Sequence, residues 1–290
     1  MEKVDLKIKK EAFKRGDFNF LYALVIAQKF FITYFYQLSS PEKKCLGKII
    51  LDFEFGRDYA VSASSLKGLG LTTGVATTRV LKPQEYHNFK MLLNVDPDFI
   101  LVRNLGAIQY FKEHAPHLEL MGDFSLNVAN SWSLDYLLGK GLSSQTLSYD
   151  ANIERILAIA EAVPALADKM EVTLYQYMPS FHMEHCVFAA FLSKGSSFRD
   201  CGKTWEKHQV SLKDQFGNHH YIKADQECRN TMFNGQAQSG AKYFMEMQRA
   251  GISQYRFEAL NESSAELWQK IQAHLDLFLI LSSPCFISLE

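Results

Sequence analysis

Three of the five cysteines share one segment with residues that could support metal chemistry. Cys186, Cys201 and Cys228 are 15 and 27 residues apart, and the same segment holds His182 and Trp205. Structural zinc sites and iron–sulfur clusters are both built from thiolates that converge from loops. This spacing matches no recognised zinc or ferredoxin pattern, and a free cysteine is often a small buried apolar side chain. The residues alone therefore leave a metal site and a packed core as alternatives.

An H-x-E-H run begins at His182 and ends at His185. Zinc hydrolase motifs place their two histidines four residues apart on a helix, and the deaminase signature continues into a P-C-x-x-C run that this segment lacks. The two histidines of this run are therefore better explained as polar loop residues near a binding site than as zinc ligands. We take His182 as a candidate substrate-binding residue.

Polar side chains recur where the apolar runs of the sequence end. Arg79 and Arg103 follow two of these runs, and Asn127 and Gln176 stand at the ends of two others. Paired guanidinium groups offer planar forks of donors that suit a carboxylate or a phosphate. Such residues also cap helices, but their recurrence on most of the runs favours a binding site. We expect Arg79, Arg103, Asn127 and Gln176 to bind substrate.

The elements that must position these residues alternate between apolar runs and amphipathic stretches. Near-continuous apolar runs are typical of parallel strands that are covered on both faces. The predicted strands cover residues 20–26, 48–54, 73–81, 99–105, 118–127, 145–150, 171–178 and 254–260. The predicted helices cover residues 29–38, 82–93, 107–114, 134–140, 153–170 and 262–279. This order predicts an α/β fold, a (β/α)8 TIM-like barrel, although an open doubly wound sheet would alternate in the same way.

The spacing of the last two predicted strands indicates an inserted segment. About 75 residues separate them, where a βα unit needs far fewer, so we expect a cysteine-containing insertion after the seventh strand, at about 179–250. Residues 1–15 are predicted to form a divergent N-terminal extension, residues 16–280 a single barrel domain, and residues 281–290 a tail. The C-terminal ends of barrel strands hold the active site, so the polar strand ends should converge there.

The composition is that of an ordinary globular protein. Hydrophobic residues make up 47% and charged residues 22%, and the formal net charge is −1. These values exclude a disordered or collagen-like chain, and they give no general basic surface for nucleic acid. The odd number of cysteines and the charged start of the chain do not indicate secretion, and the apolar stretch 21–38 is too polar to span a membrane. We expect a cytoplasmic protein with no membrane partner.

Long stretches of the sequence resemble one known family. The run MPSFHMEHCVFAAFLSKGSSFRDCG, continued by EKHQVSLKDQFGNHHYIKADQECRNTMFNGQAQSGA, strongly resembles the collagenase-like U32 peptidase family. The segments ILDFEFG, GVATTRVLKP, ILVRNLGAIQYF and GDFSLNVANSWS are similar to the same family. The resemblance covers roughly residues 46–262 and is to the C-terminal barrel of the long members.

The resemblance implies two kinds of activity. The family is named for peptidases that degrade collagen, whereas several bacterial relatives are proteins that add a 5-hydroxyl group to uridine in tRNA or to cytidine in 23S rRNA. Those relatives carry an iron–sulfur cluster and are linked to prephenate. The resemblance therefore implies iron–sulfur-dependent RNA hydroxylation, with a [4Fe–4S] cluster, prephenate as co-substrate and RNA as partner. A U32 peptidase, a collagenase-like protease, is the alternative.

By motif match, Cys186, Cys201 and Cys228 fall on cysteine positions of the family, so the resemblance implies that they hold the cluster. A further cysteine is expected four residues after Cys201, where this sequence has Trp205. Since a [4Fe–4S] cluster normally takes four thiolates, the ligand set is incomplete. Three cysteines could leave one iron open, His208 could substitute, or the cluster could be lost.

The missing cysteine also allows a third hypothesis, a non-catalytic barrel. Long family members carry another region before this one, so the chain could be truncated, or could need a partner chain that supplies the missing family region. A peptidase needs a nucleophile and a base. No Ser-His-Asp set stands out, and His185 beside Cys186 is a nucleophile–base pair in sequence alone.

Overall fold

A curled parallel sheet forms the centre of the computed structural model, which describes residues 21–26, 46–53, 56–195, 200–225 and 227–281. Its strands are β1 (Leu21–Ile26), β2 (Leu46–Leu51), β3 (Thr73–Ala76), β4 (Phe99–Val102), β5 (Glu119–Gly122), β6 (Ser144–Thr146), β7 (Met170–Gln176) and β13 (Gln254–Ala259). Strands β1 to β7 pair in chain order, and β13 pairs with both β7 and β1. The predicted α/β fold is therefore confirmed as a curled parallel sheet.

Apolar side chains on both faces of this sheet explain the continuous apolar runs. Ile100 and Val102 of β4 pack into the large outer core, while Phe99 and Leu101 belong to a small inner cluster. Successive side chains of a strand point to opposite faces, so both faces of β4 are buried. Each predicted strand overlaps an observed one, but several were predicted too long. Strand β3 ends at Ala76 rather than at residue 81, because the polar residues that follow belong to a loop.

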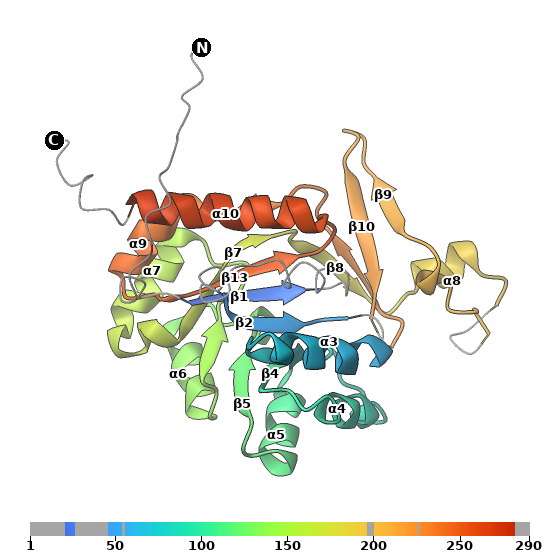
Figure 1. Cartoon of the computed structure of the whole chain (residues 1–290), viewed down its shortest axis with the longest axis horizontal. Helices are drawn as coiled ribbons and strands as arrows, with labels where there is room; N and C mark the ends of the chain where they lie inside the picture. Colours follow the sequence, from blue (N-terminus) through green and yellow to red (C-terminus); the bar gives the residue numbers. More distant parts are fainter. Residues whose placement is uncertain (1–20, 27–45, 54–55, 196–199, 226, 282–290) are drawn as a thin grey trace.

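Helices cover the outside of the curled sheet (Figure 1). They are α3 (Gly56–Gly68), α4 (Tyr86–Leu93), α5 (Leu105–His114), α6 (Ser131–Gly139), α7 (Ile153–Ala162), α9 (Phe244–Arg249) and α10 (Ser264–Leu281). Helices α5, α6 and α7 begin at asparagine caps, where the side chains of Asn104, Asn130 and Asn152 each accept a backbone N–H of the first turn. The predicted helix 153–170 divides at Pro164, which begins a 3₁₀ segment (Pro164–Lys169). The predicted helix 29–38, the extension 1–15 and the tail from residue 282 lie outside the described residues.

A second sheet lies between β7 and β13 in the chain. It is antiparallel, in the order β8 (Pro179–Met183), β11 (Asn230–Phe233), β10 (His219–Ala224) and β9 (Val210–Lys213), and it stands at one end of the parallel sheet (Figure 1). The short helix α8 (Val187–Leu192) accompanies it. The chain then returns through β12 (Gln238–Ser239), which pairs with the end of β7.

Candidate functional site

A network of buried ion pairs fills the inside of the parallel sheet. Arg256 of β13 is fully buried and contacts Asp123, which directly follows β5, and Glu171 of β7. Arg103, after β4, donates from Nε to the other oxygen of Asp123 at 2.7 Å. Its two terminal nitrogens donate to the carboxylate of Asp52 at 2.9 and 2.7 Å. Asp123 therefore joins the two arginines into one network.

The network holds its members in their charged forms. Burial alone would lower the pKa of Arg103, but Asp52 and Asp123 outweigh burial and raise it well above its ordinary value. Burial would likewise raise the pKa of Asp123, yet Arg103 and Arg256 lower it. Buried charges are tolerated when they are paired and hydrogen-bonded in this way. The guanidinium of Arg103 is thus occupied by protein carboxylates, although the sequence predicts it as a substrate ligand.

Arg79 stands in the loop after β3 and has a different environment. Its guanidinium lies 4.4 Å from the centre of the Phe124 ring, and Phe124 stacks on Tyr149 with ring centres 3.7 Å apart. Arg79 is half-buried, and it forms no ion pair with any carboxylate in the part of the chain that the structure describes. Burial and then the charge of Arg103 lower its pKa, but a guanidinium stays protonated in proteins. Such a cation is suited to an anionic ligand.

His182 of β8 reaches the same place from the second sheet. Its Nδ1 lies 2.9 Å from the hydroxyl of Thr231, and its buried Nε2 has no hydrogen-bond partner among the described residues. Burial lowers the pKa of His182 to about 4, and the nearby charges of Arg79, Arg229 and Arg103 act in the same direction. The imidazole is therefore neutral at pH 7. The structure brings two predicted site residues, Arg79 and His182, into one electrostatic neighbourhood.

The other two predicted substrate ligands occupy different positions. Gln176 stands at the end of β7, is 7% exposed, and lines a cavity beside β6 and α7. Asn127 is exposed and ends a short 3₁₀ turn with a left-handed backbone (φ 56°), a conformation that asparagine tolerates. In the described structure no hydrogen bond joins the Asn127 side chain to Arg79 or Gln176. Its position is that of a turn residue.

The three cysteines lie in a small core on one face of the second sheet, which we call the thiol core. Its buried members are Phe188, Cys201, Trp205, Ile222 and Ala224, with Cys186 and Cys228 packed against them. The Sγ of Cys186 accepts from the backbone N–H of Ala189 at 3.4 Å. Burial, followed by the neighbouring Cys186 and Cys201, raises the pKa of Cys228 to about 12. The three thiols are therefore close enough to affect one another.

The thiol core contains the three cysteines that the resemblance implies as cluster ligands, and it contains no fourth cysteine among the described residues. Trp205, at the position of the expected fourth cysteine, is 8% exposed and packs in the same core as Cys201. His208, the predicted substitute, is exposed. Within the described ranges, no group of three or more His, Cys, Asp or Glu side chains is arranged to hold a single metal ion. Thiolates are the metal-binding form, so binding would have to remove the proton of Cys228.

Two members of the ion network, Glu171 and Arg256, could not be found by a search for polar residues at strand ends. Both stand inside apolar strands, and the β13 sequence QYRFEA contains the signal, because an arginine in a strand buried on both faces requires a carboxylate partner. The identity of that partner depends on the strand order.

The fold and site together define an α/β protein with a charged, strand-end site on a curled parallel sheet. The family model for peptidase family U32 matches residues 73–276. The chain therefore belongs to peptidase family U32. No curated protein was found to match the sequence.

Several solved structures are similar at low identity. The U32 peptidase Mk0906 is 10% identical with a TM-score of 0.48, over 87% of this chain and 97% of that one. The C-terminal domain of a putative chitinase from Desulfitobacterium hafniense DCB-2 is 10% identical, with a TM-score of 0.46 over 88% and 99% of the chains. Thiamine phosphate pyrophosphorylase from Pyrococcus furiosus is 11% identical, with a TM-score of 0.46 over 88% and 95%. Among the described residues, no helix is both long and apolar enough to cross a membrane.

Proposed function

We propose that this U32 chain is an RNA-modifying protein that binds an organic acid at Arg79 and takes part in C5-hydroxylation of a pyrimidine in RNA. The observation that supports the proposal is the half-buried guanidinium of Arg79, which lies against an aromatic ring and has no ion pair in the described part of the chain. A carboxylate ligand would supply the missing charge through a forked contact. Prephenate, which the family resemblance implies, has the carboxylate chemistry that this site requires.

The surroundings of Arg79 suit a carboxylate ligand that also has an apolar part. Phe124 and Tyr149 provide a stacked aromatic wall, and the buried Nε2 of His182 and Oγ1 of Thr78 have no partner among the described residues. Neutral His182 can donate to the ligand or accept from it, depending on the tautomer. Each of these groups gains a partner if the acid binds, so binding satisfies polar atoms that are otherwise buried at a cost.

We propose further that the parallel sheet is a complete (β/α)8 barrel and that the segment bearing the second sheet is its insertion. The pairing of β13 with β1 supports this view. We also propose that Cys186, Cys201 and Cys228 bind a [4Fe–4S] cluster, which when bound would supply electron transfer. The shared thiol core supports three ligands, and the fourth position is left to a group other than a cysteine of this core.

A U32 peptidase remains the second candidate function, because the family is named for peptidases. In a peptidase Cys186 would be the available nucleophile. Its Sγ interacts with amide groups, whereas His185, the base predicted from the sequence, is exposed and forms no hydrogen bond with Cys186 in the described structure. Cleavage of denatured collagen by the wild type, lost in Cys186→Ser, would favour this function over RNA hydroxylation.

The experiment compares the wild type with Arg79→Met and with Arg155→Met, a matched control at an exposed arginine of α7. Prephenate binding is measured by calorimetry, and 5-hydroxylated pyrimidines are measured by mass spectrometry of RNA from cells that depend on each variant. We expect the wild type and the control to bind the acid and modify RNA, and Arg79→Met to lose both. Binding that survives Arg79→Met would contradict the acid site, and wild-type cells without any 5-hydroxypyrimidine would contradict RNA hydroxylation.

The cluster proposal has its own test. Iron and acid-labile sulfide are measured per chain after anaerobic purification of the wild type and of Trp205→Cys. Near-stoichiometric iron in the wild type would show that three cysteines suffice. Iron only in Trp205→Cys would show that the natural chain has lost the cluster through that substitution, and the cluster would then play no part in its activity.

A further inference from the structure

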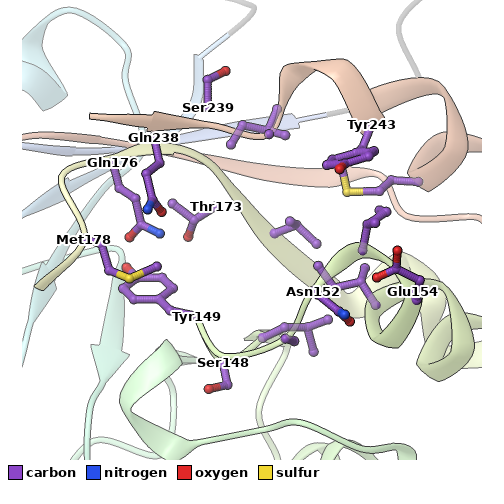
Figure 2. Close-up of a pocket in the computed structure, with 18 residues that line it drawn as sticks. Ser148, Tyr149, Asn152, Glu154, Thr173, Gln176, Met178, Gln238, Ser239 and Tyr243 are labelled. Atoms are coloured by element: carbon purple, nitrogen blue, oxygen red, sulfur yellow. The ribbon is translucent and has the colours of Figure 1, made fainter. Parts of the chain in front are cut away.

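A separate cavity of about 320 Å³ lies at the C-terminal ends of β6 and β7, next to α7 (Figure 2). The pairing of β6 with β7 ends at Thr146 and Glu171, and β12 pairs with β7 further along, at Tyr175 and Gln176. The cavity fills the space that opens where β6 leaves the edge of β7. Its size is that of a pocket for a small molecule.

Two buried oxygens of β7 line this cavity without a partner. They are Oε1 of Gln176 and Oγ1 of Thr173, and neither has a hydrogen-bond partner among the described residues. The Gln176 side chain is more than nine-tenths buried, and Figure 2 shows it beside Met178 and Tyr149 at one end of the cavity. A buried acceptor without a partner costs free energy, so a ligand that donates to both oxygens would recover it.

The charges of the cavity differ from those around Arg79. No Lys, Arg or His is among its lining residues, and its single acidic group, Glu154, is exposed. The rest of the wall combines apolar side chains, among them Leu147, Val172, Leu174 and Met247, with neutral polar ones such as Asn152. An anion would therefore enter without a compensating charge and would face unpaired acceptors. A neutral molecule with a donor and an apolar body matches the wall.

We propose that this cavity, which we call the β6–β7 pocket, binds a small uncharged ligand whose N–H or O–H groups donate to Gln176 Oε1 and Thr173 Oγ1. The apolar body of the ligand would lie against apolar lining residues such as Met178, which Figure 2 shows beside Gln176. The pocket is a second ligand site beside the acid site at Arg79, and it does not depend on the proposed RNA hydroxylation.

A matched pair of probes tests the chemistry of the pocket. Benzamide is neutral and carries an N–H donor, whereas benzoate has nearly the same shape but is an anion without a donor. Saturation-transfer NMR on the full chain measures binding of each probe, and millimolar affinity is expected for ligands this small. The variants are Thr173→Val and Gln176→Leu, which keep the volume of the side chain and remove the acceptor.

Thr146→Val on the neighbouring strand is the matched control for the threonine substitution. The Thr146 hydroxyl has hydrogen-bond partners, because its oxygen lies 3.0 Å from the carbonyl oxygen of Gly122 and 2.8 Å from Oε1 of Glu171. Removing a satisfied hydroxyl should lower the melting temperature, whereas removing the unsatisfied Thr173 hydroxyl should leave it unchanged or raise it. This contrast separates a ligand-binding oxygen from an ordinary structural one without the use of any probe.

We expect a saturation-transfer signal for benzamide with the wild type. This signal should fall at least tenfold in Gln176→Leu and several-fold in Thr173→Val, and benzoate should give little signal with any of the three proteins. Arg79→Met should leave benzamide transfer unchanged, which distinguishes this pocket from the acid site. Equal transfer to both probes, benzamide transfer that survives both β7 substitutions, or no benzamide transfer at millimolar concentration would each overturn the proposal. A fall in melting temperature of Thr173→Val as large as that of Thr146→Val would also overturn it.

Discussion

The strand ends of the parallel sheet divide into two regions with opposite properties. In the first, the paired region, Asp52, Arg103, Asp123, Glu171 and Arg256 form a continuous network of ion pairs. In the second, the unpaired region, Arg79 after β3 has no ion pair among the described residues, and Gln176 Oε1 and Thr173 Oγ1 of β7 have no hydrogen-bond partner there. The charged groups of the first region are paired with one another, whereas Arg79 in the second region has no such pair in the described part of the chain.

This difference separates structural from functional charges. Buried groups that satisfy one another stabilise the fold and leave nothing for a ligand. Buried groups without partners lower stability, and proteins keep such groups where activity requires them. The paired region should therefore respond to substitution with a loss of stability, and the unpaired region with a loss of binding.

The largest expected effect follows from Arg256→Met, which leaves Glu171 buried without its cation and Asp123 paired with Arg103 alone. Breaking a buried ion pair by removing one partner costs about 3–5 kcal/mol of unfolding free energy. Urea unfolding measures this change against Arg155→Met, which should stay within about 0.5 kcal/mol of the wild type. A loss below about 1 kcal/mol for Arg256→Met would remove the distinction between the two regions.

A smaller effect concerns His182 and acid. Its pKa is about 4 in the folded chain, below the ordinary value of 6.5, so the unfolded chain takes up the proton first as the pH falls. The free energy of unfolding should therefore drop between pH 6.5 and about 4, by about 1 kcal/mol once solvent screening of this half-buried group is allowed for. His182→Gln should lack this part of the acid sensitivity, and His117→Gln, at an exposed histidine, should keep it. Identical acid profiles for His182→Gln and the wild type would contradict the burial of the ring.

Tyr149→Phe tests the boundary between the two regions. The Tyr149 hydroxyl donates to Glu258 at 2.7 Å, while its ring stacks on Phe124 beside Arg79. The substitution keeps the ring and removes one hydrogen bond, so we expect a loss of about 1 kcal/mol in unfolding free energy with little change in acid binding. A large loss of acid binding with unchanged stability would instead assign the hydroxyl to the ligand site.

The smallest expected effect on stability is that of Arg79→Met. The variant removes a half-buried cation that has no carboxylate partner in the described residues, so the unfolding free energy should change by less than about 0.5 kcal/mol, or rise. Differential scanning calorimetry without ligand checks this expectation. A loss comparable to that of Arg256→Met would mean that Arg79 belongs to the structural network.

The sequence predicts the parallel strands well because burial on both faces produces continuous apolar runs. It fails for α3, whose small and polar residues, GRDYAVSASSLKG, make a weakly amphipathic helix. It also fails for the second sheet. The strands of that sheet are short and largely exposed. Strand β9 (Val210–Lys213), for example, lacks the continuous apolar run that is typical of the parallel strands.

The sequence predicts where the candidate site residues lie better than it predicts what each of them contacts. Arg79 and Arg103 have equivalent places after neighbouring strands, and the sequence predicts the same task for both. The structure gives them different tasks, because Asp52 and Asp123 reach Arg103 but not Arg79. Such pairings depend on which strands become neighbours, and the strand order cannot be derived from the pattern of a single sequence. The cysteine positions could be found from the family resemblance, whereas their shared core could be seen only in the fold.

The bridge through Asp123 also constrains the order in which this chain can fold. Asp123 contacts Arg256 across a sequence separation of 133 residues, and Arg103 contacts Asp52 across 51. During synthesis Glu171 emerges well before Arg256, the arginine that neutralises it, and Asp123 at first has Arg103 as its only cation. The sheet can thus reach its final state only after β13 has been made, and contacts between such distant residues form slowly. Until then the carboxylate of Glu171 has no cation at the centre of the partly made chain, which favours late and cooperative closure of the fold.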